Sequence, residues 1–308
     1  MQENNQRRNP FLLAPTLMLP ILIILGIAGF VVSEPLEKNI SYIVALLLFF
    51  FAFGLPTFLF FRMRGGKWIS SYVEKLSVRS VILCISASLL MMAHSAAYRS
   101  LTLGDFFDHR IYTVYGMPFL IDADSIGSLV GTFFILAFVP ALLEGIFFRG
   151  ILMYEYRYGG ILLSIFMPSV LYAMTGAEFS SFPLYFMNGV MLSVIVFLTG
   201  NLFCSVFAHI LYILFSMFGE KYLLFLAAET ETRAVMLFLL FGAWLTVAIF
   251  FFDAAENLLR KRGESERKKP IGLTKRTRFV VFYDIFSTPM LWADAICFFA
   301  VSILHLVL

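Results

Sequence analysis

Long apolar runs separated by short polar segments form the dominant pattern along this chain. Nine runs follow one another, at residues 11–32, 40–61, 80–98, 125–153, 160–175, 182–199, 202–218, 234–252 and 285–308. A helix needs about 20 apolar residues to cross a bilayer core, and each run reaches or approaches that length. The pattern therefore predicts an all-α, polytopic transmembrane helix bundle of about 8–9 spans, in which the fifth, sixth and seventh helices are short and packed inside.

Two segments between the runs carry patterns of their own. Residues 68–76 place aromatic and aliphatic side chains beside Glu74 and Lys75, which predicts an amphipathic helix at the membrane interface. Residues 99–124 are too rich in aromatic and aliphatic side chains for a solvated linker. This second segment is predicted to pack over the bundle as a cap.

Composition agrees with the apolar pattern. The 308 residues are 60% hydrophobic and only 14% charged, which is typical of a polytopic membrane protein and excludes an ordinary soluble domain. The first run is longer than a signal-peptide core and lacks a small-residue cleavage pattern, so we expect it to be retained. We interpret residues 1–308 as a single integral membrane domain.

The basic residues are distributed unevenly between the loops. If nine spans begin with a cytoplasmic N-terminus, eighteen of the 23 Lys and Arg residues fall inside, and ten of the 20 acidic residues fall outside. The positive-inside rule therefore predicts a multi-pass protein of the cell membrane with a cytoplasmic N-terminus. The basic segment at residues 260–269 fits a topology anchor or a contact with anionic lipid, and no nucleic-acid partner is expected.

Two charged residues interrupt the fourth run. Glu144 and Arg149 lie where lipid or packed helices are expected, and a charge at that depth costs about 3 kcal/mol or more. One interpretation is structural, with Arg149 reaching the interface and Glu144 hydrogen-bonded inside the bundle. The other is that the two residues form a functional site.

Three segments in order support the functional interpretation. They are Glu144-Gly145-Ile146-Phe147-Phe148-Arg149-Gly150, then residues 169–176, and then residues 186–212 with Thr199-Gly200-Asn201-Leu202 seven residues before His209. Together they resemble the CPBP family of intramembrane glutamic proteases, which includes type II CAAX prenyl endopeptidases and bacteriocin-processing relatives. The family pattern is E-E-x-x-x-R-G, F-x-x-x-H, T-G-S-L and H-x-x-x-N. The resemblance marks residues 125–216 as a CPBP-like catalytic core.

The resemblance implies roles for three residues and shows three departures. It implies that Glu144 activates the attacking water, and it aligns Arg149 and His209 with the family's arginine and last histidine. Gly145 replaces the second glutamate, Gly176 replaces the first histidine, and Ile213 replaces the asparagine. The two glycines permit close helix packing, while the hydroxyl of Tyr172, one turn before Gly176, could fill part of the space of the missing histidine.

Helix geometry predicts how the charged pair is arranged. On an α-helix, residues five apart point about 140° away from each other, so Glu144 and Arg149 are expected on different faces. Positions 145 and 149 share a face, so Arg149 lacks the partner that a glutamate at position 145 would supply. We expect Arg149 to turn to the cytoplasmic interface or to a backbone carbonyl.

Two functions are compatible with this pattern. The first is an intramembrane endopeptidase that cleaves a membrane-associated peptide or protein, such as a bacteriocin leader, near the cytoplasmic leaflet. The second is a catalytically inactive pseudoprotease that binds a membrane peptide or partner in bacteriocin immunity or regulation. A transporter is disfavoured, because no broken helix recurs in two matching halves.

The remaining polar positions predict no further site. One glutamate and one histidine are too few ligands for a metal, so neither a metal nor a cofactor is expected. Three other polar residues in the apolar runs match no motif and are interpreted as packing or interfacial residues: His94, Asp294 and His305.

Overall fold

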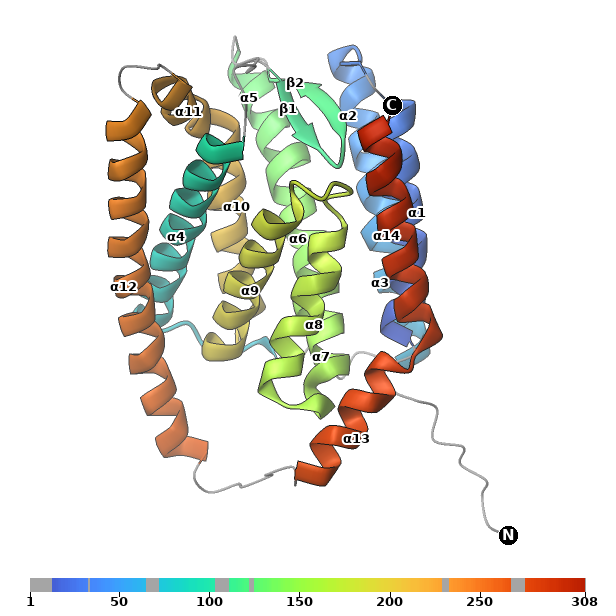
Figure 1. Cartoon of the computed structure of the whole chain (residues 1–308), viewed down its shortest axis with the longest axis vertical. Helices are drawn as coiled ribbons and strands as arrows, with labels where there is room; N and C mark the ends of the chain where they lie inside the picture. Colours follow the sequence, from blue (N-terminus) through green and yellow to red (C-terminus); the bar gives the residue numbers. More distant parts are fainter. Residues whose placement is uncertain are drawn as a thin grey trace.

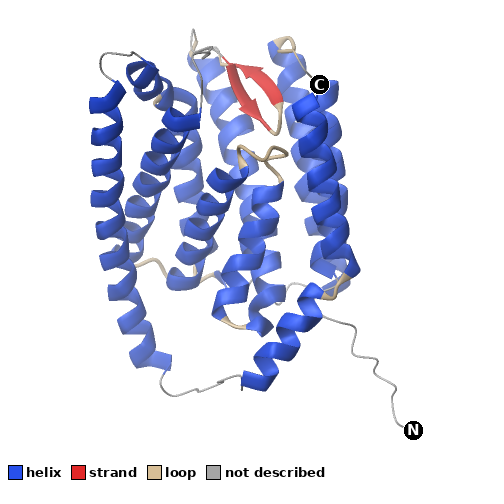
Figure 2. Cartoon of the chain, viewed as in Figure 1, coloured by secondary structure: helices blue, strands red, loops and turns tan. Residues whose placement is uncertain are grey.

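Helices and one β-hairpin build the fold (Figure 2). The computed structural model describes residues 13–32, 34–64, 72–102, 111–121, 125–228, 233–266 and 275–307. The helices are α1 (Leu13–Val31), α2 (Lys38–Phe49), η1 (Phe50–Gly54), α3 (Leu55–Arg64), α4 (Val78–Thr102), α5 (Ile126–Thr132), η3 (Phe133–Phe138), α6 (Val139–Glu144), η4 (Gly145–Leu152), α7 (Met153–Tyr156), η5 (Arg157–Gly159), α8 (Ile161–Met174), α9 (Phe182–Thr199), α10 (Leu202–Phe218), α11 (Glu220–Ala228), α12 (Arg233–Glu266), α13 (Lys275–Phe286) and α14 (Pro289–Val307). The strands are β1 (Ile111–Val114) and β2 (Met117–Leu120).

The helices confirm an all-α polytopic bundle. Within the described ranges, seven helices are long and apolar enough to cross a membrane, and α10 with α11, bent by 48°, makes an eighth. The fifth predicted span forms α8, whose 14 residues rise about 21 Å, less than the bilayer core of about 30 Å. It lies beside α9 as a short helical hairpin, which agrees with the predicted packing inside the bundle.

The two ends of the bundle are distinct (Figure 1). One end holds the β-hairpin and the end of α14, and we refer to it as the hairpin end. The opposite end holds the start of α1, the end of α12 and the start of α13, and we refer to it as the α13 end. The first and last spans therefore enter and leave the bundle at opposite ends.

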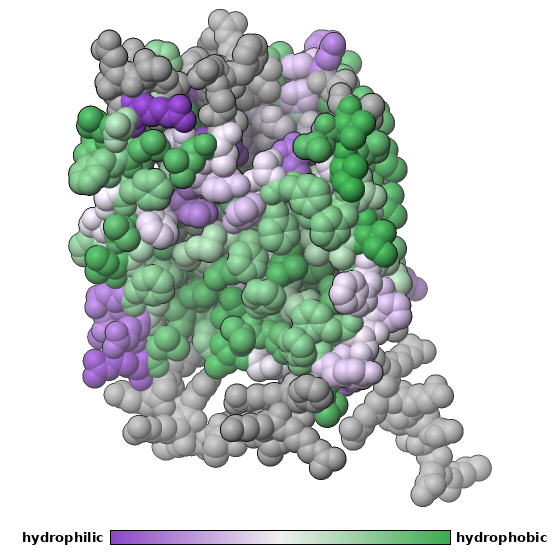
Figure 3. All heavy atoms as spheres, in the orientation of Figure 1, coloured by the Kyte–Doolittle hydropathy of each residue, from purple (hydrophilic) through white to green (hydrophobic). Residues whose placement is uncertain are grey.

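Apolar residues face outward and several charged residues face inward. Ile126 and Leu306 are more than 80% exposed, whereas Glu144, Glu220 and Asp294 are buried. Apolar side chains also cover the middle of the face drawn in Figure 3. This distribution is the reverse of that in a soluble protein, because lipid solvates the outer surface and the bundle interior must satisfy the charges. The protein is a multi-pass membrane protein.

The sequence Thr-Gly-Asn-Leu at residues 199–202 turns the chain between α9 and α10. Gly200 ends α9 with φ of 63°, a left-handed conformation that glycine adopts without strain. Asn201 begins α10 by accepting a hydrogen bond from the Phe203 amide at 2.8 Å. Its side-chain amide also donates to the Glu74 carbonyl at 2.6 Å. The turn therefore fixes the segment before α4 against the end of α9.

The same contacts correct the prediction of an interfacial helix at residues 68–76. Residues 74–77 are not helical, and Val73 pairs with Asn201 as an isolated β-bridge. Backbone pairing to the turn at Gly200 replaces the helical hydrogen bonds that the amphipathic pattern predicts. Residues 68–71 lie outside the described residues.

The predicted cap is a two-stranded β-hairpin. β1 and β2 pair antiparallel, with Val114 opposite Met117, and the turn consists of Tyr115 and Gly116. Both turn residues have positive φ, 51° and 80°, as a type I′ turn requires. Val114, Tyr115, Met117 and Phe119 are buried, which confirms that this part of the segment packs on the bundle; residues 103–110 and 122–124 are outside the described ranges.

Candidate functional site

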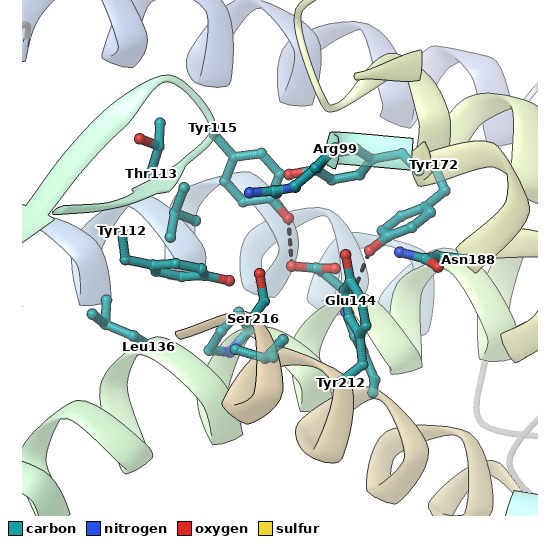
Figure 4. Close-up of a pocket in the computed structure, with 15 residues that line it drawn as sticks. Arg99, Tyr112, Thr113, Tyr115, Leu136, Glu144, Tyr172, Asn188, Tyr212 and Ser216 are labelled. Carbon is teal, nitrogen blue, oxygen red and sulfur yellow. Dashed lines mark hydrogen bonds between the residues drawn. The ribbon is translucent and has the colours of Figure 1, made fainter. Parts of the chain in front are cut away.

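A polar cavity lies beside the β-hairpin, among the helices on which the hairpin packs (Figure 4). Its lining comes from the hairpin, from the end of α4 nearest the hairpin, from α10 between its middle and its end, and from η3, α6, α8 and α9. The centre of a water molecule can occupy about 40 Å³ of this cavity. One water needs roughly 10–15 Å³ by this measure, so the cavity has room for more than one.

Glu144 contributes a carboxylate to the cavity. It is the last residue of α6 and only 3% exposed. One oxygen, Oε1, accepts a hydrogen bond from the hydroxyl of Tyr115, which reaches it from the hairpin turn (Figure 4). The other oxygen, Oε2, has no hydrogen-bond partner among the described residues. One side of the carboxylate is thus held by the protein and the other can accept a proton from a bound water.

The donor role of Tyr115 follows from its surroundings. Burial, followed by the negative charge of Glu144, raises the pKa of the Tyr115 phenol well above its ordinary value. The hydroxyl therefore keeps its proton and donates a hydrogen bond to the carboxylate. The ring packs against Phe49 and Phe53, with centroids 6.3 and 6.0 Å away, so its position is defined by α2 and η1.

His209 lies on α10 and lines the same cavity as Glu144. Its Nε2 is 3.3 Å from the hydroxyl of Tyr172 on α8. Its Nδ1 has no hydrogen-bond partner in the part of the chain that is described. The cavity thus brings together the carboxylate and the imidazole that the sequence singled out, and it adds the Tyr172 hydroxyl to them.

Arg149 is buried in the bundle and does not reach the interface. It is 1% exposed, and its guanidinium carbon lies 4.2 Å from the centroid of the Tyr172 ring. No described residue forms a hydrogen bond with its guanidinium nitrogens. The expected turn toward the cytoplasmic interface or a carbonyl is therefore wrong. A cation–π contact with a buried aromatic ring takes its place, and such a contact is strongest where water is excluded.

The helix that carries Glu144 and Arg149 also differs from the α-helix that the sequence analysis assumed. Gly145–Leu152 is a π-helix, in which hydrogen bonds join residues five apart. This winding brings position 149 back toward the face of position 144, and the charges of the two residues interact. The prediction of separate faces was wrong because it assumed 3.6 residues per turn.

Close packing accounts for two of the three departures from the family pattern. A Cβ at Gly145 would lie 2.8 Å from Cγ2 of Val206, and one at Gly176 would lie 3.1 Å from the ring of Tyr185. At both positions a side chain larger than glycine requires the neighbouring Val206 or Tyr185 side chain to move. Ile213 differs, because it lines the cavity directly and places an aliphatic group there.

A second polar cluster at the hairpin end of the cavity has no counterpart in the sequence pattern. Buried Glu220 accepts hydrogen bonds from the hydroxyls of Ser95 and Ser216, and Arg99 Nη1 lies 3.7 Å from its Oε2. Arg99 and Ser216 line the cavity. The position of Glu220 between two apolar helices is the only sequence signal that could have marked this cluster.

The polar residues interpreted as structural lie away from the cavity. His305 stacks on Phe30 with centroids 4.3 Å apart, and His94 lies beside Tyr98 and Trp244. Asp294 is fully buried in α14 near Tyr156. Within the described ranges, no three His, Cys, Asp or Glu side chains are grouped so that they could hold a metal ion.

Fold and cavity together define a multi-pass α-helical membrane protein in which a buried carboxylate and an imidazole line one cavity with room for water. Comparison with family models gives a match over residues 126–215 to the type II CAAX prenyl endopeptidase Rce1-like family. This match confirms the resemblance and supports a CAAX-type intramembrane protease fold for that part of the chain. Searches of curated proteins and of solved structures gave no match.

Proposed function

We propose that this protein is an intramembrane endopeptidase that uses Glu144 to activate water. The observation that carries the proposal is that Glu144 and His209 line one cavity with room for water, and that Oε2 of Glu144 has no partner among the described residues. A general base must lie within hydrogen-bond reach of the water whose proton it takes, and an unpartnered carboxylate oxygen in a cavity with room for water supports this role.

The proposed reaction is a direct hydrolysis. Glu144 accepts a proton from water through Oε2 while the water oxygen attacks the carbonyl carbon of the scissile peptide bond. Negative charge develops on the carbonyl oxygen, and the Tyr172 hydroxyl and the His209 ring are placed to donate hydrogen bonds to it. Glu144 then passes its proton to the leaving nitrogen as the C–N bond breaks, which yields a carboxylic acid and an amine.

Arg149 acts through the positive charge of its guanidinium and does not contact the substrate. Its guanidinium stacks on the ring of Tyr172, and its charge interacts with Glu144. In a medium of low dielectric constant, a fixed positive charge stabilises the negative charge that develops in the transition state. We therefore assign Arg149 an electrostatic role.

The position of the cavity supports a proposal for the depth in the membrane at which cleavage takes place. We propose that the α13 end is cytoplasmic, because eighteen of 23 basic residues fall on that side in the nine-segment topology. Arg149, one of the eighteen, is buried and does not contribute to a loop, but the asymmetry remains. The cavity lies toward the hairpin end, so cleavage of a membrane-embedded peptide is proposed in the outer half of the cell membrane and not near the cytoplasmic leaflet.

A second candidate is a pseudoprotease that binds a membrane peptide without cleaving it. The apolar side chain of Ile213 in the cavity favours this function, as does the absence of the family's second glutamate and first histidine. Bacteriocin immunity or regulation of a membrane partner would need binding alone. In this case Glu144 would satisfy the Tyr115 hydroxyl and have no chemical role.

A cleavage assay separates the two candidates. Purified protein in liposomes is incubated with a library of membrane-spanning peptides, and new termini are identified by mass spectrometry. The protease proposal predicts products with wild-type protein and none with Glu144→Gln, because an amide of nearly the same shape cannot accept the proton. Peptide capture by both proteins without any product would support the pseudoprotease.

A further inference from the structure

The hairpin turn contacts the carboxylate that the proposed mechanism uses, although it lies outside the segment that matches the family. Tyr115 precedes residue 126, where the family match begins, by eleven residues. Its hydroxyl nevertheless donates to Oε1 of Glu144 inside the bundle. The site thus includes a group from the β-hairpin as well as groups from the matched helices.

Three spans fix the turn in place. The Tyr115 ring packs between Phe49 and Phe53 of α2 and η1. Gly116 lies so close to Gly29 of α1 that an added Cβ would be 3.1 Å from its Cα, with the ring of His305 from α14 at 3.4 Å. A hydroxyl held in this way has little freedom to leave Glu144.

The backbone of Tyr115 adopts a conformation that is unusual for a large side chain. Its φ of 51° lies in the left-handed region, where asparagine, aspartate and glycine are favoured at this position of a type I′ turn. A tyrosine here is strained relative to those residues, and strained backbone is found most often at functional sites. The geometry therefore gives a reason for the tyrosine that turn formation alone does not.

We propose that Tyr115 is the positioning residue for Glu144: it holds Oε1 so that Oε2 alone faces the cavity as the base. This inference rests on the proposed protease function. A glutamate side chain has three rotatable torsions, and a second contact is needed to keep one oxygen aimed at a bound water. Because the family's second glutamate is Gly145 here, the hairpin supplies the polar partner from another part of the chain.

The test uses a change that removes only the hydroxyl. Tyr115→Phe keeps the ring between Phe49 and Phe53, so the fold is expected to remain. Misplacement of a catalytic group by about 1 Å can cost 10²-fold in rate, so we expect kcat to fall about 10- to 100-fold with KM nearly unchanged. Tyr42→Phe is the matched control, because it removes a tyrosine hydroxyl that bonds Thr132 at 2.8 Å, away from the cavity.

The outcomes separate this inference from the function on which it rests. A drop in kcat for Tyr115→Phe, with wild-type kcat for Tyr42→Phe and similar melting temperatures for both, supports the positioning role. If wild-type protein cleaves in a Glu144-dependent way and Tyr115→Phe has equal or higher kcat, the positioning role is wrong and the proposed function stands. If cleavage does not depend on Glu144, both are wrong.

Discussion

The hydroxyl of Tyr172 lies 3.3 Å from Nε2 of His209, where α8 and α10 meet at the cavity. The family pattern has phenylalanine at this position and a histidine four residues later, where this chain has Gly176. A phenol is both a donor and an acceptor, so Tyr172 offers the site one of the functions of the missing imidazole. The same ring also carries the stacked guanidinium of Arg149.

Removal of the Tyr172 hydroxyl tests whether this hydroxyl replaces the hydrogen-bond donor of the histidine that the family has four residues later. Tyr172→Phe restores the family's residue and keeps the ring for Arg149, yet we expect kcat to fall about 10²-fold. Loss of one donor to a developing oxyanion typically costs about 10²–10³ in rate. The measurement is steady-state kinetics on the best library peptide. A rate equal to wild type would show that the hydroxyl has no part in turnover.

The contact between Gly145 and Val206 predicts an effect on stability. Gly145→Ala places a methyl group 2.8 Å from Cγ2 of Val206, and overpacking of this kind costs about 1–3 kcal/mol. We therefore expect a lower melting temperature in detergent. Gly242→Ala in α12 is the control, because a Cβ there meets nothing within 4 Å, and it should be neutral or slightly stabilising.

A double-variant experiment tests whether the effects of Gly145→Ala and of Val206 on stability are coupled. Val206→Ala removes the clashing methyl group, so the double variant should be more stable than the sum of the single effects predicts. Additive losses would mean that the glycine is needed for another reason. A coupling of about 1 kcal/mol or more would confirm close packing between η4 and α10.

The third departure from the family pattern can be reversed without a steric penalty. Ile213 faces the cavity, and Ile213→Asn would add an amide one turn from His209 in a side chain of similar size. We expect kcat to rise, by up to about 10²-fold, because the amide can orient water or the substrate carbonyl. Ile213→Val is the control, since it trims the side chain without adding a polar group. Equal rates for wild type and Ile213→Asn would contradict this account of the site.

Topology can be tested by cysteine labelling. In a background without Cys84, Cys204 and Cys297, a cysteine replaces either Ser125 at the hairpin end or Asn257 of α12 toward the α13 end. We expect a membrane-impermeant reagent to label position 125 on intact cells and to label position 257 only after permeabilisation. Labelling at 257 alone on intact cells would reverse the orientation and place the cavity in the cytoplasmic half.

Much of the bundle could be predicted from the sequence, because the length of an apolar run specifies a span almost by itself. The same argument holds for residues 160–175, where a run shorter than a full span predicts a short helix, and α8 ends at Met174, too short to cross alone. The π-helix at Gly145–Leu152 could not be predicted, since its side-chain pattern resembles that of an α-helix. Only its backbone hydrogen bonds distinguish it, and they change the faces on which Glu144 and Arg149 are expected.

Only the site residues that lie in the helices matched by the family could be predicted from the sequence. Glu144 and His209 were found because a family pattern joins them across 65 residues of chain, and the structure brings both to one cavity. Tyr115 was not found, because its contact with Glu144 depends on how a hairpin turn is packed against α1, α2 and α14. A contact of this kind has no periodicity or motif that the sequence could reveal.

The central claim is that Glu144 is the base that activates water for peptide hydrolysis. The most direct measurement is the single-turnover rate constant for cleavage of one membrane peptide by wild-type protein and by Glu144→Gln, at equal melting temperature and equal peptide binding. The account predicts cleavage by the wild type and a loss of at least about 10³-fold in the variant, because no other described carboxylate lines the cavity. Equal rate constants, or no cleavage by either protein, would contradict it.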